Sequence, residues 1–196
     1  MSDAIRVGLV GFGYASKTFH APLIGGTPGM ALKAVASSDA DKVHADWPGV
    51  KVMSAPGDLL DDPDIDLVVI ATPNDTHFPL AKAALEAGKH VVVDKPFTVT
   101  LSQARELESL AKHCGRILSV FHNRRWDSDF LTVSALINEG QLGEVCYFES
   151  HFDRFRPQVR QRWREQAGPG SGIWYDLAPH LLDQVVVLFG LPVSIT

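Results

Sequence analysis

Hydrophobic positions in the 196-residue chain form short continuous runs, which alternate with longer stretches where apolar residues recur every three or four positions. The short runs predict six strands, at residues 5–10, 32–36, 50–53, 65–71, 91–93 and 117–121. The longer stretches predict helices between them. Strands that alternate with helices over short connections predict an α/β fold, a doubly wound parallel sheet with right-handed crossovers, over residues 1–120.

End signals support two of these helices. Pro79 lies in the first turn of a helix that Gly88 ends. Thr100 followed by Gln103 is a capping box, and Gly115 stops the helix that this box opens.

The pattern changes over residues 121–196. Helices are predicted at 128–138 and 176–189, with Pro179 in the first turn of the second one, where proline is tolerated. Residues 145–152 alternate like a strand with two different faces, and another strand begins at 193–196. Because these two strands cannot make a stable sheet, we expect the incomplete start of an α+β domain, either truncated or completed by a partner chain.

Composition narrows the function classes. A net charge of −5 argues against a nucleic-acid partner or a membrane surface, and no apolar run is long enough to cross a bilayer. Cys114 and Cys146 have no metal-ligand spacing, and no metal is expected. A disulfide between them stays open, but a reduced, cytoplasmic protein is the simpler interpretation.

A glycine turn follows the first strand. Gly11 permits the tight turn, and Gly13 lets the backbone approach a pyrophosphate. The segment Gly11-Phe12-Gly13-Tyr14-Ala15 leads into a helix, with Ser16 in the third small-residue place. This strand–turn–helix form is the Rossmann dinucleotide fingerprint, although ligand-free turns and methyltransferases share it. A P-loop is excluded because no Gly-Lys-Ser/Thr follows.

The tip of the second strand indicates the cofactor type. An NAD site usually has an acid here for the ribose 2′-hydroxyl. Ser37 occupies the tip, with Ser38 beside it, and Asp39 lies too far along. A serine leaves room for a 2′-phosphate, and Lys42 supplies charge, which favours NADP over NAD. The alternative is that Lys42 is only a solvated helix charge.

Polar residues follow two buried strands at their carboxyl ends, where open α/β sheets bind ligands. Thr72, Pro73, Asn74 and His77 follow the run 65–71. Asp94, Lys95 and Pro96 follow the run 91–93. A lysine beside apolar strand residues can donate to a substrate oxygen, although a lysine at a strand end is more often simply solvated.

A second candidate group lies near the carboxyl end of the chain. Asp176, His180 and Asp183 share one helix face by their spacing. Histidine is the natural proton carrier between an alcohol and a ketone, and Asp176 could orient it or bind a hydroxyl. The alternative is a helix-capping acid and an ordinary buried histidine.

The segment 154–164 is rich in arginine, with Trp163 inside it. It could form a nucleic-acid face, but nearby acids and the net negative charge favour an anionic pocket or pairing with acids.

These motifs together resemble one family. Gly11-Phe12-Gly13, Thr72-Pro73-Asn74, Asp94-Lys95-Pro96 and Gly172-x3-Asp176-x3-His180 occur in the order seen in the Gfo/Idh/MocA family, named for glucose–fructose oxidoreductase, inositol dehydrogenase and rhizopine catabolism. The resemblance covers essentially the whole chain. Segments 94–99 and 122–127 resemble a bacterial subgroup of predicted oxidoreductases.

The resemblance implies an NAD(P)-dependent oxidoreductase acting on a sugar, polyol or related hydroxy compound without a metal. It implies that Lys95 lies by the nicotinamide and that Asp176 and His180 are the second-domain acid and proton carrier. Asp94 replaces the commoner glutamate, which puts its contact in doubt. Further positions implied to approach cofactor or substrate are Asn74, His77, Arg124, Trp163 and Arg164. Family chains are longer, with a large open sheet in the second domain that is often used for homo-oligomers.

Two function hypotheses follow. In the first, His180 takes the hydroxyl proton while Lys95 stabilises the alkoxide and Asp176 holds substrate or histidine. In the second, the protein is a nucleotide-binding sensor or partner without turnover, or an inactive fragment of the enzyme. Retention of all three residues argues against the second hypothesis.

Overall fold

The structure, a computed structural model, describes residues 4–153, 155–158 and 162–195. The chain divides into two compact units, residues 1–121 and 122–196. Each unit is described by itself.

The N-terminal unit is built on a six-stranded sheet in which all neighbouring pairs are parallel. The strand order is β3-β2-β1-β4-β5-β6. The strands are β1 Ile5–Val10, β2 Met30–Ala36, β3 Lys51–Met53, β4 Leu67–Ile70, β5 His90–Asp94 and β6 Leu118–Phe121. The predicted α/β doubly wound fold is confirmed. The order reverses between β1 and β4, so their carboxyl ends flank the crevice where such folds bind ligands.

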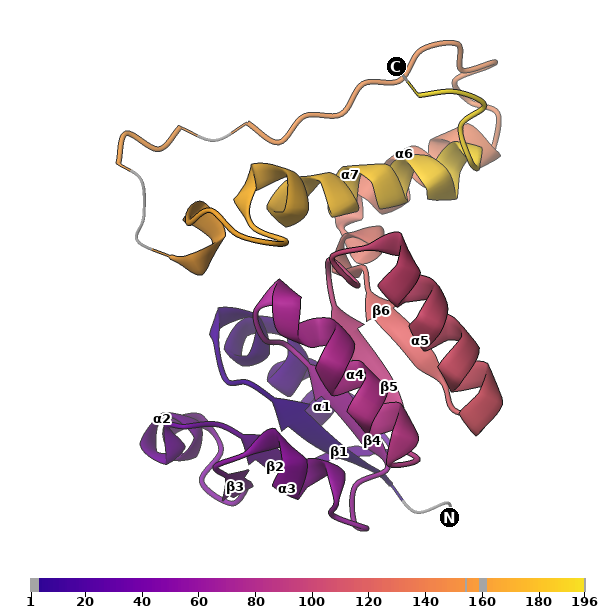
Figure 1. Ribbon diagram of the computed structural model, residues 1–196. Coiled ribbons are helices and arrows are strands. Elements are labelled where there is room, and N and C mark those ends of the chain that lie inside the picture. Colours follow the sequence, from indigo (N-terminus) through magenta and orange to yellow (C-terminus); the bar gives the residue numbers. More distant parts are fainter. Residues whose placement is uncertain (1–3, 154, 159–161, 196) are drawn as a thin grey trace. The chain divides into compact units, whose positions relative to one another are not determined.

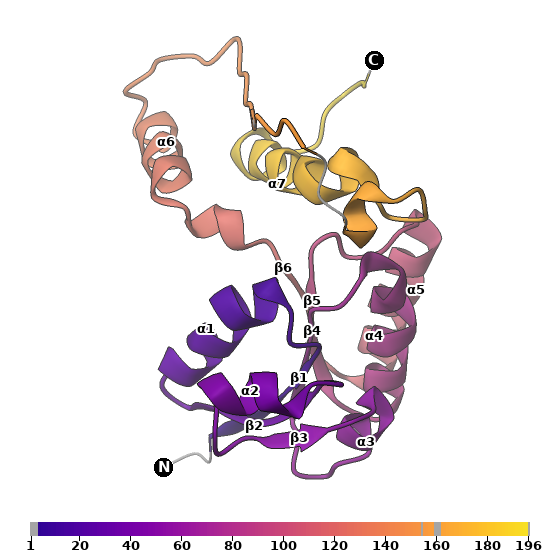
Figure 2. The same ribbon diagram turned by 90° about the vertical axis from the view of Figure 1, so that its left-hand side faces the viewer.

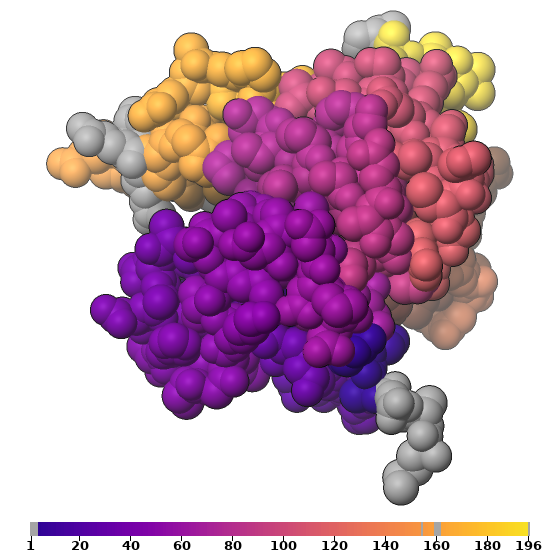
Figure 3. All heavy atoms as spheres, turned by 60° about the horizontal axis from the view of Figure 1, so that its bottom comes forward, coloured from indigo at the N-terminus to yellow at the C-terminus, as the bar shows by residue number. Residues whose placement is uncertain are grey.

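Helices cover both faces of this sheet, as Figures 1 and 2 show. They are the π-helical turn η1 Ser16–His20, α1 Ala21–Gly26, α2 Ala40–Asp46, α3 Pro56–Leu60, the 3-10 turn η2 Asn74–Thr76, α4 His77–Glu86 and α5 Leu101–Cys114. One core lies between the sheet and α1 and α2, and a second lies between the sheet and α3, α4 and α5. The space-filling view shows the indigo-to-magenta segments of this unit in close contact over one face (Figure 3).

Strand β1 shows why both faces of the sheet are apolar. Val7 and Leu9 point into the core under α1, and Val10 points into the other core. Gly8 shares the face of Val10, and a Cβ there would lie 2.6 Å from the buried side chain of Leu59. Glycine at position 8 therefore makes room for α3.

The predicted end signals of α5 are present. The Thr100 side chain accepts from the N–H of Gln103, and the Gln103 side chain accepts from the N–H of Thr100, which confirms the capping box. Gly115 caps the other end with φ +62°. The two signals work from local geometry alone, so sequence predicted them correctly.

All regular secondary structure in the described part of the C-terminal unit is helical, and the rest of it is irregular. It contains the 3-10 turn η3 Asn123–Trp126, α6 Ser128–Asn138, the 3-10 turn η4 Trp163–Glu165 and α7 Gly172–Phe189. Asp183 of α7 accepts a two-pronged ion pair from Arg125, at 2.7 and 2.6 Å, and Gln184 donates to the carbonyl of Arg124 at 3.1 Å. These contacts hold α7 against η3.

Two strand predictions are wrong. Residues 145–152 and 193–195 belong to no strand, and the described part of the second unit contains none. A strand exists only where a neighbour takes its backbone hydrogen bonds, and alternation of side chains supplies no such neighbour. Thr196 lies outside the described residues.

The predicted start of α7 is also wrong. The helix begins at Gly172, not at Asp176, so Pro179 lies in its interior and not in its first turn. Proline has a helix-compatible φ, and the long helix continues past the one N–H that Pro179 lacks.

Among the described residues, no helix is both long enough and apolar enough to cross a membrane.

Candidate functional site

Gly11 makes the turn that leaves β1. Its φ is +89°, and a Cβ built on it would lie 2.8 Å from the carbonyl oxygen of Ala71. Its N–H donates to the carbonyl of Ala36 at 2.9 Å. Any other residue at position 11 would meet both backbone strain and the end of β4, so glycine is required by the fold itself.

Gly13 differs from Gly11. Its φ is not positive, and a Cβ there would meet no heavy atom within 4 Å. The packing of the chain therefore does not require glycine at position 13. The open space before its backbone is what a pyrophosphate needs for close approach.

Two buried side chains, those of Ser16 and Phe12, hold the glycine turn in place. The Ser16 hydroxyl donates to the carbonyl of Gly11 at 2.8 Å, and its side chain is fully buried. Phe12 is buried in the core under α1 and α2. The phenyl ring is thus a packing group, and only the backbone of Phe12 is left to face a ligand.

Tyr14 and Ala15 begin the helix that continues through η1 and α1. The Lys17 N–H donates to the carbonyl of Gly13 at 3.0 Å, so helical hydrogen bonding starts at the turn. N–H groups in the first turn have no acceptor within a helix, and the helix dipole adds partial positive charge there. This end of the helix suits a phosphate.

The tip of β2 has Ser37 in the predicted place. The Ser37 hydroxyl accepts from the N–H of Asp39 at 3.2 Å, and Asp39 Oδ1 accepts from the N–H of Lys42 at 3.0 Å. The Asp39 carboxylate is therefore occupied in capping α2. Ser38 and the Lys42 side chain are exposed.

The loop after β4 is tied internally and to the loop after β5. The hydroxyls of Thr72 and Thr76 lie 2.6 Å apart, and Thr76 donates to the carbonyl of Pro73. His77 is fully buried, with Nδ1 2.8 Å from the carbonyl oxygen of Pro96 and Nε2 3.0 Å from that of Thr72. His77 thus joins two loops through its ring, while Asn74 is buried beside it at 2% exposure.

Asp94 and Lys95 end β5 at the same edge of the sheet. The N–H of Lys95 donates to Asp94 Oδ1 at 2.8 Å, and a cis peptide bond joins Lys95 to Pro96. Asp94 Oδ2 lies 3.8 Å from Nε2 of His20, a buried residue of η1. Burial by itself raises the pKa of Asp94, but His20 and Lys95 outweigh it and hold the pKa below the usual range.

The C-terminal unit brings Arg164 and Asp176 together. Arg164 Nε lies 3.4 Å from Asp176 Oδ1, and its guanidinium lies 4.4 Å from the centre of the Trp163 ring. Both charged groups line a cavity of about 570 Å³ at the start of α7. Arg156 and Arg162 line the same cavity and pair with Glu165. Arg154 and Arg160 lie outside the described residues.

His180 does not line that cavity, although it shares α7 with Asp176. Its side chain is 6% exposed, and its ring lies 6.3 Å from the ring of Phe152. The Arg124 guanidinium lies 4.9 Å from the same Phe152 ring and binds Asp127 at 2.7 Å. Phe152 therefore contacts two predicted site residues, His180 and Arg124.

Sequence reasoning missed several of these neighbours. Two of them, His20 and Phe152, adjoin predicted site residues in space but not in sequence. The only available signal for His20 was a histidine one turn beyond the small residue Ser16.

The described residues contain no group of His, Cys, Asp and Glu that could hold a metal ion.

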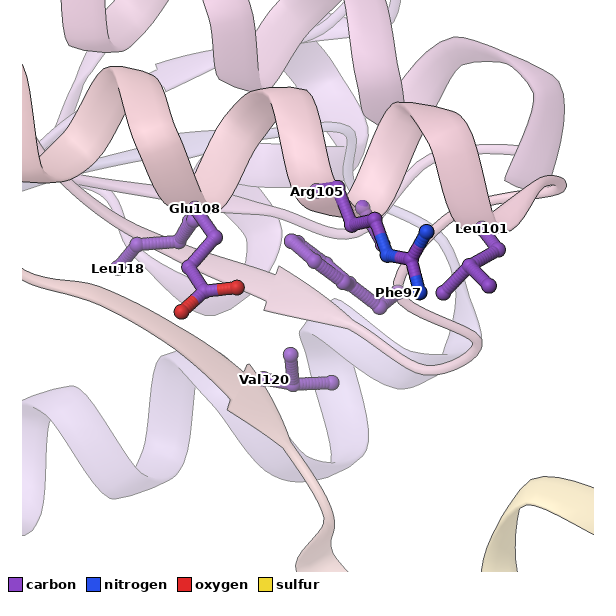
Figure 4. A pocket seen from close by; sticks show the side chains of 7 residues that line it. Phe97, Leu101, Arg105, Glu108, Leu118 and Val120 are labelled. Carbon is purple, nitrogen blue, oxygen red and sulfur yellow. The ribbon is translucent and has the colours of Figure 1, made fainter.

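A separate cavity of about 360 Å³ lies between α5 and β6 (Figure 4). Phe97, Leu118 and Val120 form its floor, with Arg105 and Glu108 on α5. No predicted site residue lines it, so it is not part of the candidate site.

Both units of the chain match models of a known protein family. Residues 5–122 match the Gfo/Idh/MocA oxidoreductase family, described as an NAD-binding Rossmann fold. The chain belongs to this family. Residues 134–196 match the C-terminal alpha/beta domain of the Gfo/Idh/MocA family.

Individual proteins are similar to this chain over nearly its whole length. Escherichia coli K12 YdgJ, named an uncharacterized oxidoreductase, is 79% identical over all of this chain and 57% of its own length. Bacillus subtilis IolW, named scyllo-inositol 2-dehydrogenase (NADP(+)), is 39% identical over 99% of this chain and 54% of its length. The solved structure of the YPO2259 oxidoreductase candidate from Yersinia pestis has a TM-score of 0.92 at 71% identity, over 98% of this chain and 54% of that one. The chain spans about half the length of these relatives.

Proposed function

We propose that the protein is an NADP(H)- or NAD(H)-dependent oxidoreductase that acts on a sugar, polyol or related hydroxy compound. The proposed cofactor site rests on the contrast between Gly11 and Gly13. Gly11 is required by the fold, whereas the space before Gly13 serves no packing purpose in the chain. A bound pyrophosphate at the β1 turn explains that space.

The residues present fit the cofactor. The N–H groups from Gly13 to Ala15 would hold the pyrophosphate, and Ser37 would face the adenosine ribose. Thr72, Asn74 and Lys95 follow β4 and β5, at the edge of the sheet that would take the nicotinamide half. When bound, the nicotinamide supplies the hydride acceptor or donor.

NADP is the proposed preference. Asp39 accepts a hydrogen bond from the N–H of Lys42 through its carboxylate oxygen Oδ1. This capping role supports Ser37 as the residue at the ribose. The name of IolW, which includes NADP(+), agrees with this preference. Ser37→Asp would place a negative charge where the 2′-phosphate binds. We expect this variant to lose NADPH affinity and to gain NADH affinity relative to the parent.

For the substrate, we propose roles in both units. Lys95 donates a hydrogen bond to the reacting oxygen and stabilises its negative charge. His180 exchanges the hydroxyl proton, and Asp176 binds a neighbouring hydroxyl. Arg164 holds the Asp176 carboxylate by an ion pair and so orients it. Hydroxy compounds as substrates are supported by the resemblance of these motifs and by the inositol in the name of IolW.

The first test is a thermal-shift titration with NADPH and, separately, NADH. Ligand at 100 times its dissociation constant stabilises a protein by about 2.7 kcal/mol. For the N-terminal unit, this corresponds to a rise of roughly 10 °C in the unfolding midpoint. A larger rise with NADPH is expected. No rise with either cofactor would refute the proposed cofactor site, and a larger rise with NADH would refute the assignment of Ser37.

A substrate panel then separates the enzyme from a binding protein without turnover. We expect cofactor-dependent turnover of at least one polyol or sugar. Lys95→Ala and His180→Ala should lower that turnover far more than they lower cofactor affinity. Tight cofactor binding with no turnover across the panel would favour a nucleotide sensor, and near-parental turnover in both variants would contradict the assigned roles.

A further inference from the structure

The helix that follows the glycine turn contains a π-helical segment, Ser16–His20. Segments of this kind have an extra residue per turn and are frequent at functional sites. Both ends of this one point inward, since Ser16 is fully buried and His20 is 4% exposed. The Ser16 end is bonded to the glycine turn through the carbonyl of Gly11. The His20 end is buried at the carboxyl end of β5.

His20 meets a buried charge there. Its Nε2 lies 3.8 Å from Asp94 Oδ2, an ion-pair distance that is too long for a direct hydrogen bond. Its ring packs on Phe121 with the ring centres 4.2 Å apart. Within the described part of the chain, Nε2 has no hydrogen-bond partner. The ring is therefore placed by Phe121, with its Nε2 facing the Asp94 carboxylate.

Asp94 transmits this contact to Lys95. One carboxylate oxygen faces His20, and the other accepts the backbone N–H of Lys95. Asp94 is 8% exposed, and a buried charge of this kind is costly unless opposite charge compensates it. On the other side of Lys95, the carbonyl of Pro96 is bound by His77. The backbone of Lys95 is thus fixed from both sides.

We propose that His20 and Asp94 are positioning residues, a buried pair that connects the helix of the glycine turn to Lys95. The proposal rests on the assigned roles of the glycine turn and Lys95. Its consequence is that the cofactor-binding helix and the reacting lysine move as one body. Loss of either partner then lowers turnover while the N–H groups that hold the pyrophosphate stay in place.

The pair itself is tested without any ligand, by following the carboxyl carbon of Asp94 in an NMR pH titration. The charged groups that face Asp94 are His20 and Lys95. In His20→Asn, burial still opposes ionisation, but the compensating imidazole is gone. The pKa of Asp94 should therefore rise. His113→Asn makes the same chemical change on the exposed face of α5 and should leave this pKa unchanged.

The link to Lys95 is tested by its acylation rate, measured by mass spectrometry. Asp94→Asn removes a negative charge that favours the ammonium form, so Lys95 should react faster. We expect the acylation rate of Lys95 to rise about threefold. The exposed Lys33 is the internal reference and should react at its parental rate. This variant also decides the proposal if His20→Asn does not fold.

The effect on catalysis is measured on the substrate found in the panel. We expect His20→Asn to lower turnover about 10–100-fold, the cost of a misplaced group, with NADPH affinity within about twofold of the parent. The double variant His20→Asn with Asp94→Asn should lose less than the product of the two single losses, because no buried charge is left unpaired. An unchanged pKa of Asp94 in His20→Asn, or an unchanged Lys95 rate in Asp94→Asn, overturns the pair. The pKa of Asp94 and the acylation rate of Lys95 can both be measured without a substrate. They therefore test the pair even if the proposed function fails.

Discussion

The two glycines of the turn should respond in opposite ways to the same substitution. Gly11→Ala places a methyl group at φ +89°, which costs about 1–2 kcal/mol of backbone strain. The same methyl lies 2.8 Å from the Ala71 carbonyl oxygen and 3.0 Å from Thr72 Cγ2. Overpacking of this kind costs about 1–3 kcal/mol. We therefore expect a loss of roughly 2–5 kcal/mol in the free energy of unfolding.

Gly13→Ala has neither cost, because its φ is not positive and its Cβ would meet no atom within 4 Å. Its free energy of unfolding should stay within about 0.5 kcal/mol of the parent. The methyl group does, however, fill the space proposed for the pyrophosphate. We expect NADPH affinity to fall by about tenfold or more, which is the factor that 1.4 kcal/mol gives.

The assays are thermal unfolding and calorimetric titration with NADPH on the same preparations. A loss of about 2–5 kcal/mol in a unit of this size lowers the unfolding midpoint by about 8–20 °C. Gly26→Ala is the matched control, since a Cβ there also meets open space but lies at the far end of α1. It should lose neither stability nor affinity. Parental affinity in Gly13→Ala, or a parental midpoint in Gly11→Ala, would refute the division of roles.

Two further predictions concern stability. Asp66 accepts hydrogen bonds from the Arg6 guanidinium and backbone N–H, which together lower its pKa to about 2. A depressed carboxyl pKa stabilises the fold above the unfolded value near 4 and loses that stabilisation as pH falls to about 2. The urea midpoint should therefore drop more steeply between pH 5 and 2 in the parent than in Asp66→Asn, and equal slopes would contradict the pair. Thr100→Ala removes the capping box of α5 and should cost about 1 kcal/mol in urea unfolding, whereas Ser109→Ala on the exposed face of α5 should cost little; equal losses would argue against the cap.

Features that depend on neighbouring residues were predictable from the amino-acid sequence. The apolar run at 65–71 became the buried strand β4, and the signals at Thr100 and Gly115 became the ends of α5. Gly11 adopts the left-handed conformation that its motif predicts. Each of these follows from backbone geometry within a few residues, so no knowledge of distant contacts was needed.

Contacts between distant residues depend on how the elements pack, and local sequence patterns do not reveal them. His20 faces Asp94, and His77 binds the carbonyl of Pro96, because parallel pairing brings the carboxyl ends of separate strands to one edge. In the second unit, Phe152 contacts both His180 and Arg124 because the chain at residue 152 packs against α7 and η3. The alternation over residues 145–152 was real but misleading, since a strand needs a partner for its backbone hydrogen bonds and side-chain pattern cannot supply one. Local patterns fix the elements of this protein, whereas its candidate site is fixed by the packing of those elements.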